Sequence, residues 1–158
     1  MVCEISFKLN GQDVSLKTDP LRRLLDVLRE DFGMMGTKEA CGEGECGACS
    51  ILKDGRMVTS CLIPIGAVQG CHLMTIEGLR ETERGKCIIE AFADGGAVQC
   101  GFCIPGMVIA AENLLASNPH PTREEIRYGI SGNLCRCTGY DLIVESIKLA
   151  SERGNGLW

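Results

Sequence analysis

The chain lacks most features that would give it a membrane, nucleic-acid or catalytic role of its own. It has only seven aromatic residues and two histidines among 158 residues. No apolar run approaches the ~20 residues that a membrane-spanning helix needs. The 16 basic residues form no blocks, and the net charge of −5 gives no electrostatic footprint for nucleic acid. There is no Ser-His-Asp set, carboxylate pair or phosphate-binding loop, so we expect no catalytic residue on this chain.

The amino-terminus lacks the basic region and apolar stretch of a signal peptide, which predicts a cytoplasmic protein. Eleven cysteines then need an explanation, because disulfides are rare in that compartment. An odd number also cannot pair completely. The cysteines therefore indicate ligation of a metal or a cluster.

The N-terminal half has the pattern of a small mixed α+β domain, residues 1–79. Alternation of polar and apolar residues predicts two strands, over 5–9 and 14–18. The turn signal Asp54-Gly55 predicts a hairpin of strands 50–53 and 57–60, and 72–76 is expected to form one more short strand. Asp19 followed by Pro20 predicts a helix start, and Gly33 its end. The segment 36–49 has no periodicity and is expected to form a wrapped loop.

The C-terminal half, residues 80–158, has helical periodicity. We expect a charged linker over 79–86 and then a four-helix arrangement. The expected helices cover 87–92, 104–116, a segment begun by the capping box of Thr122 and Glu125, and 142–149. A core of about 80 residues rarely supplies more than roughly 3–5 kcal/mol, so each half needs a further source of stability.

The first cysteine set has the spacing of a plant-type 2Fe–2S site, C-x4-C-x2-C with a distant fourth ligand. Its members are Cys41, Cys46, Cys49 and Cys61. Glycines in the loop allow positive φ and let backbone N–H groups turn toward the cluster; these are Gly42, Gly44 and Gly47. Zinc is the alternative, but three ligands in one glycine-rich loop do not resemble paired zinc knuckles.

The second set combines C-x2-C with C-x-C after 31 intervening residues, as Cys100, Cys103, Cys135 and Cys137. Both pairs precede predicted helices, whose N-terminal N–H groups favour thiolates and anionic clusters. This spacing also suits zinc. Beside a plant-type motif in the same chain, a second 2Fe–2S site is the better hypothesis.

The remaining motifs and cysteines give weaker functional predictions. Residues 42–47 satisfy G-x-G-x-x-G, but no convincing strand precedes them and the cysteines occupy the loop, so we reject a dinucleotide site. We interpret Cys3, Cys71 and Cys87 as small buried hydrophobes. Arg136, between two ligands, either raises the potential of its cluster or faces solvent or a partner.

Three segments resemble those of the molybdenum hydroxylases, the xanthine oxidase family of molybdopterin-dependent enzymes. They are TKEACGEGECGAC at 37–49, GAVQCGFC at 96–103 and SGNLCRCTGY at 131–140. The resemblance extends from Ile5 to Ile147 and matches the separate small iron–sulfur subunit of bacterial and archaeal members. Departures at Ala40, Ser50 and Ile104 remove no ligand and bear only on the subfamily.

This resemblance implies a β-grasp plant-type ferredoxin-like domain followed by a four-helix-type 2Fe–2S-binding domain. It implies a large subunit with the molybdenum–molybdopterin cofactor and a medium subunit with FAD, in a hetero-oligomer such as a dimer of heterotrimers. The cluster of the helical domain would lie nearer molybdenum and the other nearer FAD. Gln99 would lie beside the pterin, or else form a simple hydrogen bond at a helix end.

From the sequence we therefore expect an electron-transfer subunit of a dehydrogenase of the xanthine, nicotinate, aldehyde or carbon monoxide type. It would carry electrons from molybdenum through two 2Fe–2S clusters to FAD. Two alternatives belong to other classes. One is a free-standing two-cluster ferredoxin with several partners, and the other is a zinc-stapled binding module without a redox role.

Overall fold

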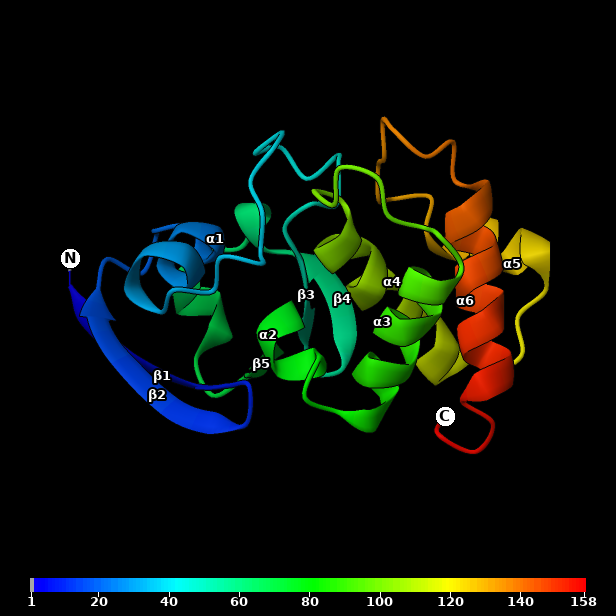
Figure 1. The fold of residues 1–158 in the computed structure, drawn as a ribbon. Coiled ribbons are helices and arrows are strands. Elements are labelled where there is room, and N and C mark those ends of the chain that lie inside the picture. Colours follow the sequence, from blue (N-terminus) through cyan, green and yellow to red (C-terminus); the bar gives the residue numbers. More distant parts are fainter. Residues whose placement is uncertain (1) are drawn as a thin grey trace.

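The computed structural model describes residues 2–158. A β-sheet with short helical segments occupies one end of the molecule, and a group of helices occupies the other (Figure 1). The α+β class expected from the sequence is confirmed, with a β-sheet domain followed by a helical domain. No helix within residues 2–158 is long and apolar enough to cross a membrane.

The sheet has five strands in the order β2-β1-β5-β3-β4. The strands are β1 (Cys3–Leu9), β2 (Gln12–Thr18), β3 (Ser50–Lys53), β4 (Arg56–Thr59) and β5 (His72–Met74). Two antiparallel hairpins form its edges, and β5 joins them by pairing parallel to β1 and antiparallel to β3. The hairpin at Asp54-Gly55 therefore fixes the strand that precedes the fourth cysteine of the first set.

The predicted helix over 19–33 is wrong in its extent. The structure has only α1 (Leu24–Asp26) and a π-helical turn, η1 (Val27–Asp31). The carbonyl groups of Pro20 and Arg22 accept hydrogen bonds from Gly66 and Ile65, in the 3-10 segment η3 (Ile65–Val68), and so cannot serve a helix. The apolar residues of the segment nevertheless pack on the sheet as the periodicity predicts, with Leu24, Val27 and Leu28 fully buried.

The expected linker over 79–86 is also wrong. Helix α2 (Ile76–Leu79) enters this segment, and α3 (Glu83–Asp94) begins inside it. The Thr82 hydroxyl caps α3 by accepting the Gly85 N–H, and Leu79 is buried in the helical core. The start of α3 resembled a linker in the sequence because its charged residues form the exposed face of the helix.

The remaining helices are α4 (Ile104–Ser117), α5 (Arg123–Gly129) and α6 (Asp141–Arg153), so α3 to α6 make the expected four. The capping box of Thr122 and Glu125 is present at the start of α5. Helix α4 is the central one, because it contacts α3 and α5 and also packs on β3 and β4. Leu52 of β3 belongs to the helical core, which therefore continues into the sheet.

Candidate iron–sulfur centres

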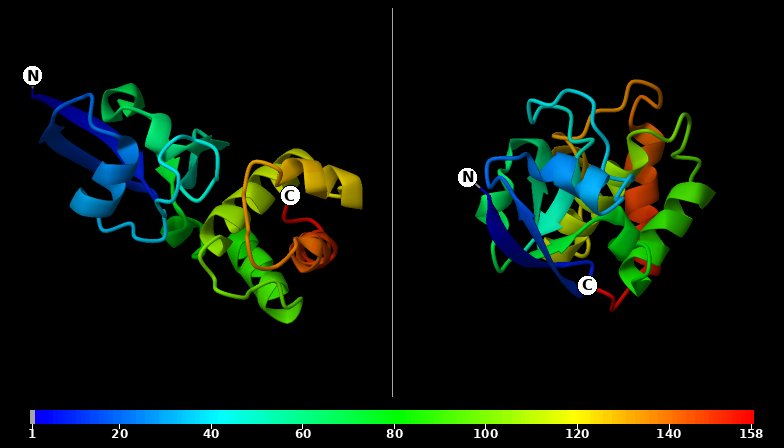
Figure 2. Two further views of the ribbon diagram at one scale, coloured as in Figure 1. Left: turned by 90° about the horizontal axis from the view of Figure 1, so that it is seen from above. Right: turned by 90° about the vertical axis from the view of Figure 1, so that its left-hand side faces the viewer.

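Three loops carry seven of the eight motif cysteines, and all three lie on the same side of the molecule; the eighth, Cys61, lies in the 3-10 segment η2 (Ser60–Leu62) that follows β4. In Figure 1 the three loops form the upper edge of the molecule, as the cyan loop after η1, the green loop before α4 and the orange loop before α6. The two turned views in Figure 2 keep these loops close to one another. The fold thus gathers segments from both halves of the sequence at one edge.

The first loop has the backbone conformation expected of its glycines. Gly42, Gly44 and Gly47 all have positive φ, between 68° and 78°. A side chain at Gly44 would overlap Leu62, and one at Gly47 would come within 2.5 Å of the Gly132 carbonyl oxygen. The loop is therefore curled tightly and pressed against neighbours, and glycine is required both for its conformation and for its packing.

The thiols of the first set lie close enough to affect one another. Cys41 interacts with Cys46, and Cys61 interacts most strongly with Cys49 and also with Cys41. The pKa of Cys41 is lowered to about 7, mainly because the Glu43 N–H donates to its sulfur at 3.4 Å. Burial, and then the neighbouring Cys49, raise the pKa of Cys61 to about 11. Cys41 and Cys46 are thus partly open to solvent, whereas Cys49 and Cys61 are buried.

The second set forms two pairs, although its members come from distant segments. The sulfur atoms of Cys100 and Cys137 lie 3.6 Å apart, and Cys103 interacts with Cys135. Burial raises the pKa of Cys103 to about 12. Burial acts to raise the pKa of Cys135, but hydrogen bonds from Thr138, including its hydroxyl at 3.1 Å, together with those from the Cys137 N–H and from Cys103, outweigh it and lower the pKa to about 7.

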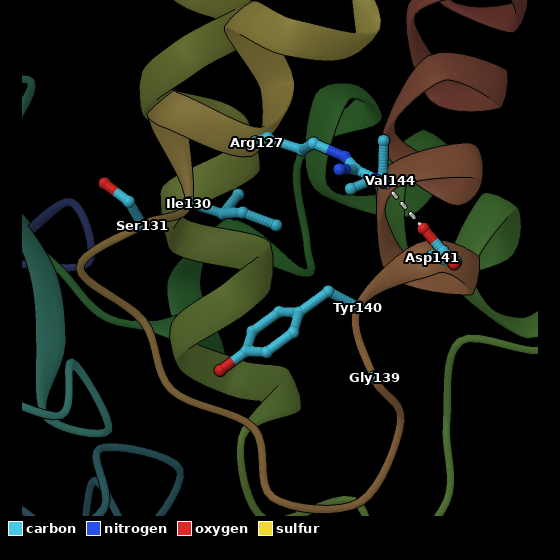
Figure 3. Close-up of a pocket in the computed structure, with 7 residues that line it drawn as sticks. All are labelled: Arg127, Ile130, Ser131, Gly139, Tyr140, Asp141 and Val144. Carbon is cyan, nitrogen blue, oxygen red and sulfur yellow. Dashed lines mark hydrogen bonds and ion pairs between the residues drawn. The ribbon is translucent and has the colours of Figure 1, made fainter.

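Tyr140 positions the segment that carries Cys135. Its hydroxyl accepts the Cys135 backbone N–H at 2.9 Å, and its backbone has φ of +72°, which is rare for a bulky residue. Tyr140 lines a cavity of about 380 Å³ between α5 and α6. Figure 3 shows its ring and, across the same cavity, Arg127 reaching from α5 to Asp141. The tyrosine therefore closes the loop onto the start of α6.

The cysteine loop that follows η1 and the cysteine loop that precedes α6 touch each other directly. The Leu134 N–H donates to the Cys46 carbonyl oxygen at 2.9 Å, which links the neighbour of one motif cysteine to another motif cysteine. The Asn133 side chain donates to the Gly47 carbonyl oxygen and to the Ser50 hydroxyl. Neither contact could be foreseen from the sequence, because the partners are more than 80 positions apart.

These donor sets fit 2Fe–2S clusters. All eight thiols are free of disulfides, and each set supplies four sulfur atoms, as two irons with two thiolate ligands each require. Within residues 2–158, no three cysteine, histidine or acidic side chains gather as they would around one ion. Backbone and hydroxyl hydrogens already point at Cys41 and Cys135, which favours their thiolate forms.

The other candidate residues lie nearby or apart. Gln99 and Arg136 are exposed beside their neighbouring cysteines. Cys71 and Cys87 are partly buried, whereas Cys3 is exposed, so the interpretation of Cys3 as a buried hydrophobe is wrong. It stands at the first position of β1, on the same face as the buried Ile5, but the burial of that face begins only at Ile5.

Comparison with known proteins assigns the two halves to two types of iron–sulfur domain. Residues 7–68 match the 2Fe-2S iron-sulfur cluster binding domain, and residues 75–148 match the [2Fe-2S] binding domain. The chain thus has two iron–sulfur-binding domains in tandem.

Three relatives match over nearly their whole length. The nicotinate dehydrogenase small FeS subunit of Eubacterium barkeri is 48% identical over 149 residues, which are 94% of this chain and 95% of the relative. The xanthine dehydrogenase iron-sulfur-binding subunit of Escherichia coli is 42% identical over 147 residues, which are 90% and 91%. The crystal structure of quinoline 2-oxidoreductase from Pseudomonas putida 86 contains a chain with a TM-score of 0.92 and 41% identity, covering 98% of this chain and 97% of that one.

The chain belongs to the small 2Fe–2S subunits of the molybdenum hydroxylases, the family that includes xanthine and nicotinate dehydrogenases and aldehyde oxidoreductases. It is therefore part of an oxidoreductase, as the sequence motifs predicted.

Proposed function

We propose that this chain relays electrons from a molybdenum cofactor through two 2Fe–2S clusters to FAD, with both partner cofactors on other subunits. The observation that carries the proposal is the placement of two four-thiol sets on one edge, joined by a direct hydrogen bond between their loops. The clusters would supply one-electron carriers, which allow a two-electron oxidation to be passed on stepwise. The chain itself holds the clusters and sets their distance and surroundings.

The interactions between the thiols support a distribution of the ligands over the individual irons. Cys41 with Cys46, and Cys49 with Cys61, would each hold one iron of the first cluster. Cys100 with Cys137, and Cys103 with Cys135, would hold the two irons of the second. Gly42, Gly44 and Gly47 would wrap the first cluster with their backbone, which their positive φ supports.

Surface properties support a different partner for each cluster. Cys100 and Cys137 are exposed, and exposed apolar side chains flank them, at Val98, Phe102 and Leu134. This face would dock on the large molybdenum-binding subunit, with exposed Gln99 placed beside the pterin. The first loop would face the medium, FAD-binding subunit with its exposed acidic rim, which consists of Glu39, Glu43 and Glu45.

Visible absorption and EPR spectroscopy test the cofactor content. The purified protein should be coloured and, after reduction, should show two distinct EPR signals, each from one cluster. A colourless protein that contains zinc and gives no EPR signal after reduction would refute the redox role and favour the zinc-stapled module.

Purification from the native host tests the assembly. Tagged protein should bring down one subunit with molybdenum and one with FAD. If it elutes alone with both clusters loaded, the free-standing ferredoxin is correct and the complex is not. Sequencing of the co-purified molybdenum subunit would then identify the substrate class.

A further inference from the structure

Asn133 stands out among the polar residues outside the cysteine motifs, because it is only 2% exposed and reaches into the other domain. Its side-chain Nδ2 donates to the Gly47 carbonyl oxygen at 3.0 Å and to the Ser50 Oγ at 3.2 Å. Gly47 lies between two motif cysteines, and Ser50 directly follows the third. The side-chain amide of Asn133, in the loop before α6, thus binds the cysteine loop that follows η1.

The atoms around this amide are packed too closely to admit an added side chain at the neighbouring glycines. A Cβ atom at Gly47 would lie 2.6 Å from Asn133 Nδ2, and one at Gly106 would lie 2.5 Å from the Gly47 carbonyl oxygen. Gly106 is in the first turn of α4, close to Cys103. The loop at Gly47 is therefore clamped between α4 and the 131–137 segment, and the Leu134–Cys46 hydrogen bond continues the same contact.

The energetic cost of Asn133 argues for a specific role. Its Oδ1 is buried without a hydrogen-bond partner among residues 2–158, and an unpaired buried oxygen destabilises a fold. An apolar residue of similar size would avoid this cost, but would leave the Gly47 carbonyl without its donor. The arrangement favours a defined position of the loops over maximal stability.

We propose that Asn133 is a positioning residue that fixes the separation and orientation of the two cluster-binding loops, and thereby controls electron exchange between the clusters. The proposal rests on the proposed function, because it requires that both clusters are bound. Within residues 2–158, the Asn133 side chain forms no hydrogen bond to a motif thiol; it acts through the Gly47 carbonyl and the Ser50 hydroxyl, and its neighbour Leu134 acts through the Cys46 carbonyl. When the amide is removed, the loops can separate although each keeps its own four cysteines.

The test compares Asn133→Asp with the wild-type chain and with Asn155→Asp, an exposed control. The aspartate is nearly isosteric but lacks both N–H donors. The readout is the magnetic interaction between the two reduced clusters in EPR spectra, which falls steeply with distance. We expect this interaction to be lost or clearly weakened in Asn133→Asp and unchanged in Asn155→Asp, while the separate signals of both clusters keep their positions.

An unchanged interaction in Asn133→Asp with both clusters loaded would overturn the proposal. If this variant fails to load both clusters, Ser50→Ala decides, because it removes one acceptor of the same amide and should weaken the interaction less. An unchanged spectrum of Ser50→Ala would then overturn it. If the wild-type chain binds only one cluster, the proposed function is refuted. If the wild-type chain binds two clusters that show no magnetic interaction, the role of Asn133 is refuted and the proposed function is not.

Discussion

In the N-terminal half, the four cysteines of the first set lie in one loop and at the end of the hairpin that follows it. In the helical half, the second set joins segments that lie before and after α4 and α5, and Cys100 and Cys137 are 37 positions apart. The first loop is shaped by glycines with positive φ, whereas Thr138 and the strained Tyr140 shape the second. The first site is therefore local and rests on the sheet, whereas the second joins two distant segments and so cross-links a large part of its domain.

Chain entropy alone does not make these two sites very different. A cross-link that closes the first set contributes about 3 kcal/mol, and one that closes the second about 4 kcal/mol. The larger contrast lies in what remains without the link. Five paired strands still hold the first loop, whereas the segment before α6 depends on the Tyr140 hydroxyl and on contacts with the first loop.

The largest expected effect comes from Cys135→Ser. It should remove the second cluster and destabilise the helical half by about 4 kcal/mol, since a long segment loses its cross-link. The spectrum of the first cluster should survive. Absorbance, EPR and thermal unfolding followed by circular dichroism measure the three quantities.

Cys46→Ser is the matched variant for the first set. It should remove the first cluster and leave the helical signal with a nearly unchanged unfolding midpoint. Loss of both clusters in either variant would show that the halves do not fold as separate units and would contradict the division into domains at residues 79 and 80.

Gly47→Ala should have the next largest effect, because the contact between the loops lies at this residue. Both Gly47 and Gly42 have φ near +69°, so alanine costs about 1–2 kcal/mol of backbone strain at either position. Only at Gly47 would the added Cβ also meet the Gly132 carbonyl and Asn133, whereas at Gly42 its nearest neighbour is Arg23 at 3.5 Å.

Gly42→Ala therefore serves as the control for strain alone. Thermal unfolding of the two holoproteins should show a lower midpoint for Gly47→Ala, and its second cluster should be lost more easily. Equal midpoints would mean that the inter-loop contact adds no stability.

The sequence predicted short-range patterns but not the contacts between distant segments. The spacing placed Cys100 and Cys137 in one set, and the structure brings their sulfur atoms to 3.6 Å, while the capping box of Thr122 was visible as a short-range pattern. Asn133 could not be recognised, because its partners lie 83 and 86 positions earlier in the chain.

The errors in secondary structure have two origins. The helix expected from Asp19 failed because Pro20 and Arg22 are hydrogen-bonded to a segment more than 40 positions later. The expected linker was wrong for a local reason, because Thr82 caps α3 and the charged residues that follow are good helix formers. A tertiary contact decided the first segment, and a local signal that was misread decided the second.

A smaller effect is expected at the surface where the two halves meet. The Asn113 side chain of α4 accepts the Met57 N–H of β4 at 2.9 Å. Asn113→Ala removes the acceptor and should destabilise the protein by about 1 kcal/mol, whereas Asn113→Asp keeps an acceptor and should cost less. Denaturant titration compares the two, and a smaller loss in the alanine variant would contradict this role.

The smallest effect tests whether damage in the helical half stays there. Thr122 accepts the Glu125 N–H and closes the capping box of α5, so Thr122→Ala should cost roughly 0.5–1 kcal/mol of helical stability. Helix α5 contacts α4 and α6 but contributes no motif cysteine. The second cluster should therefore be lost at a slightly lower temperature, while the temperature at which the first cluster is lost stays the same. A parallel shift of both temperatures would mean that the contact through Asn133 and Leu134 joins the halves into one cooperative unit. The two sites would then still differ in which segments supply their cysteines, but no longer in their stability.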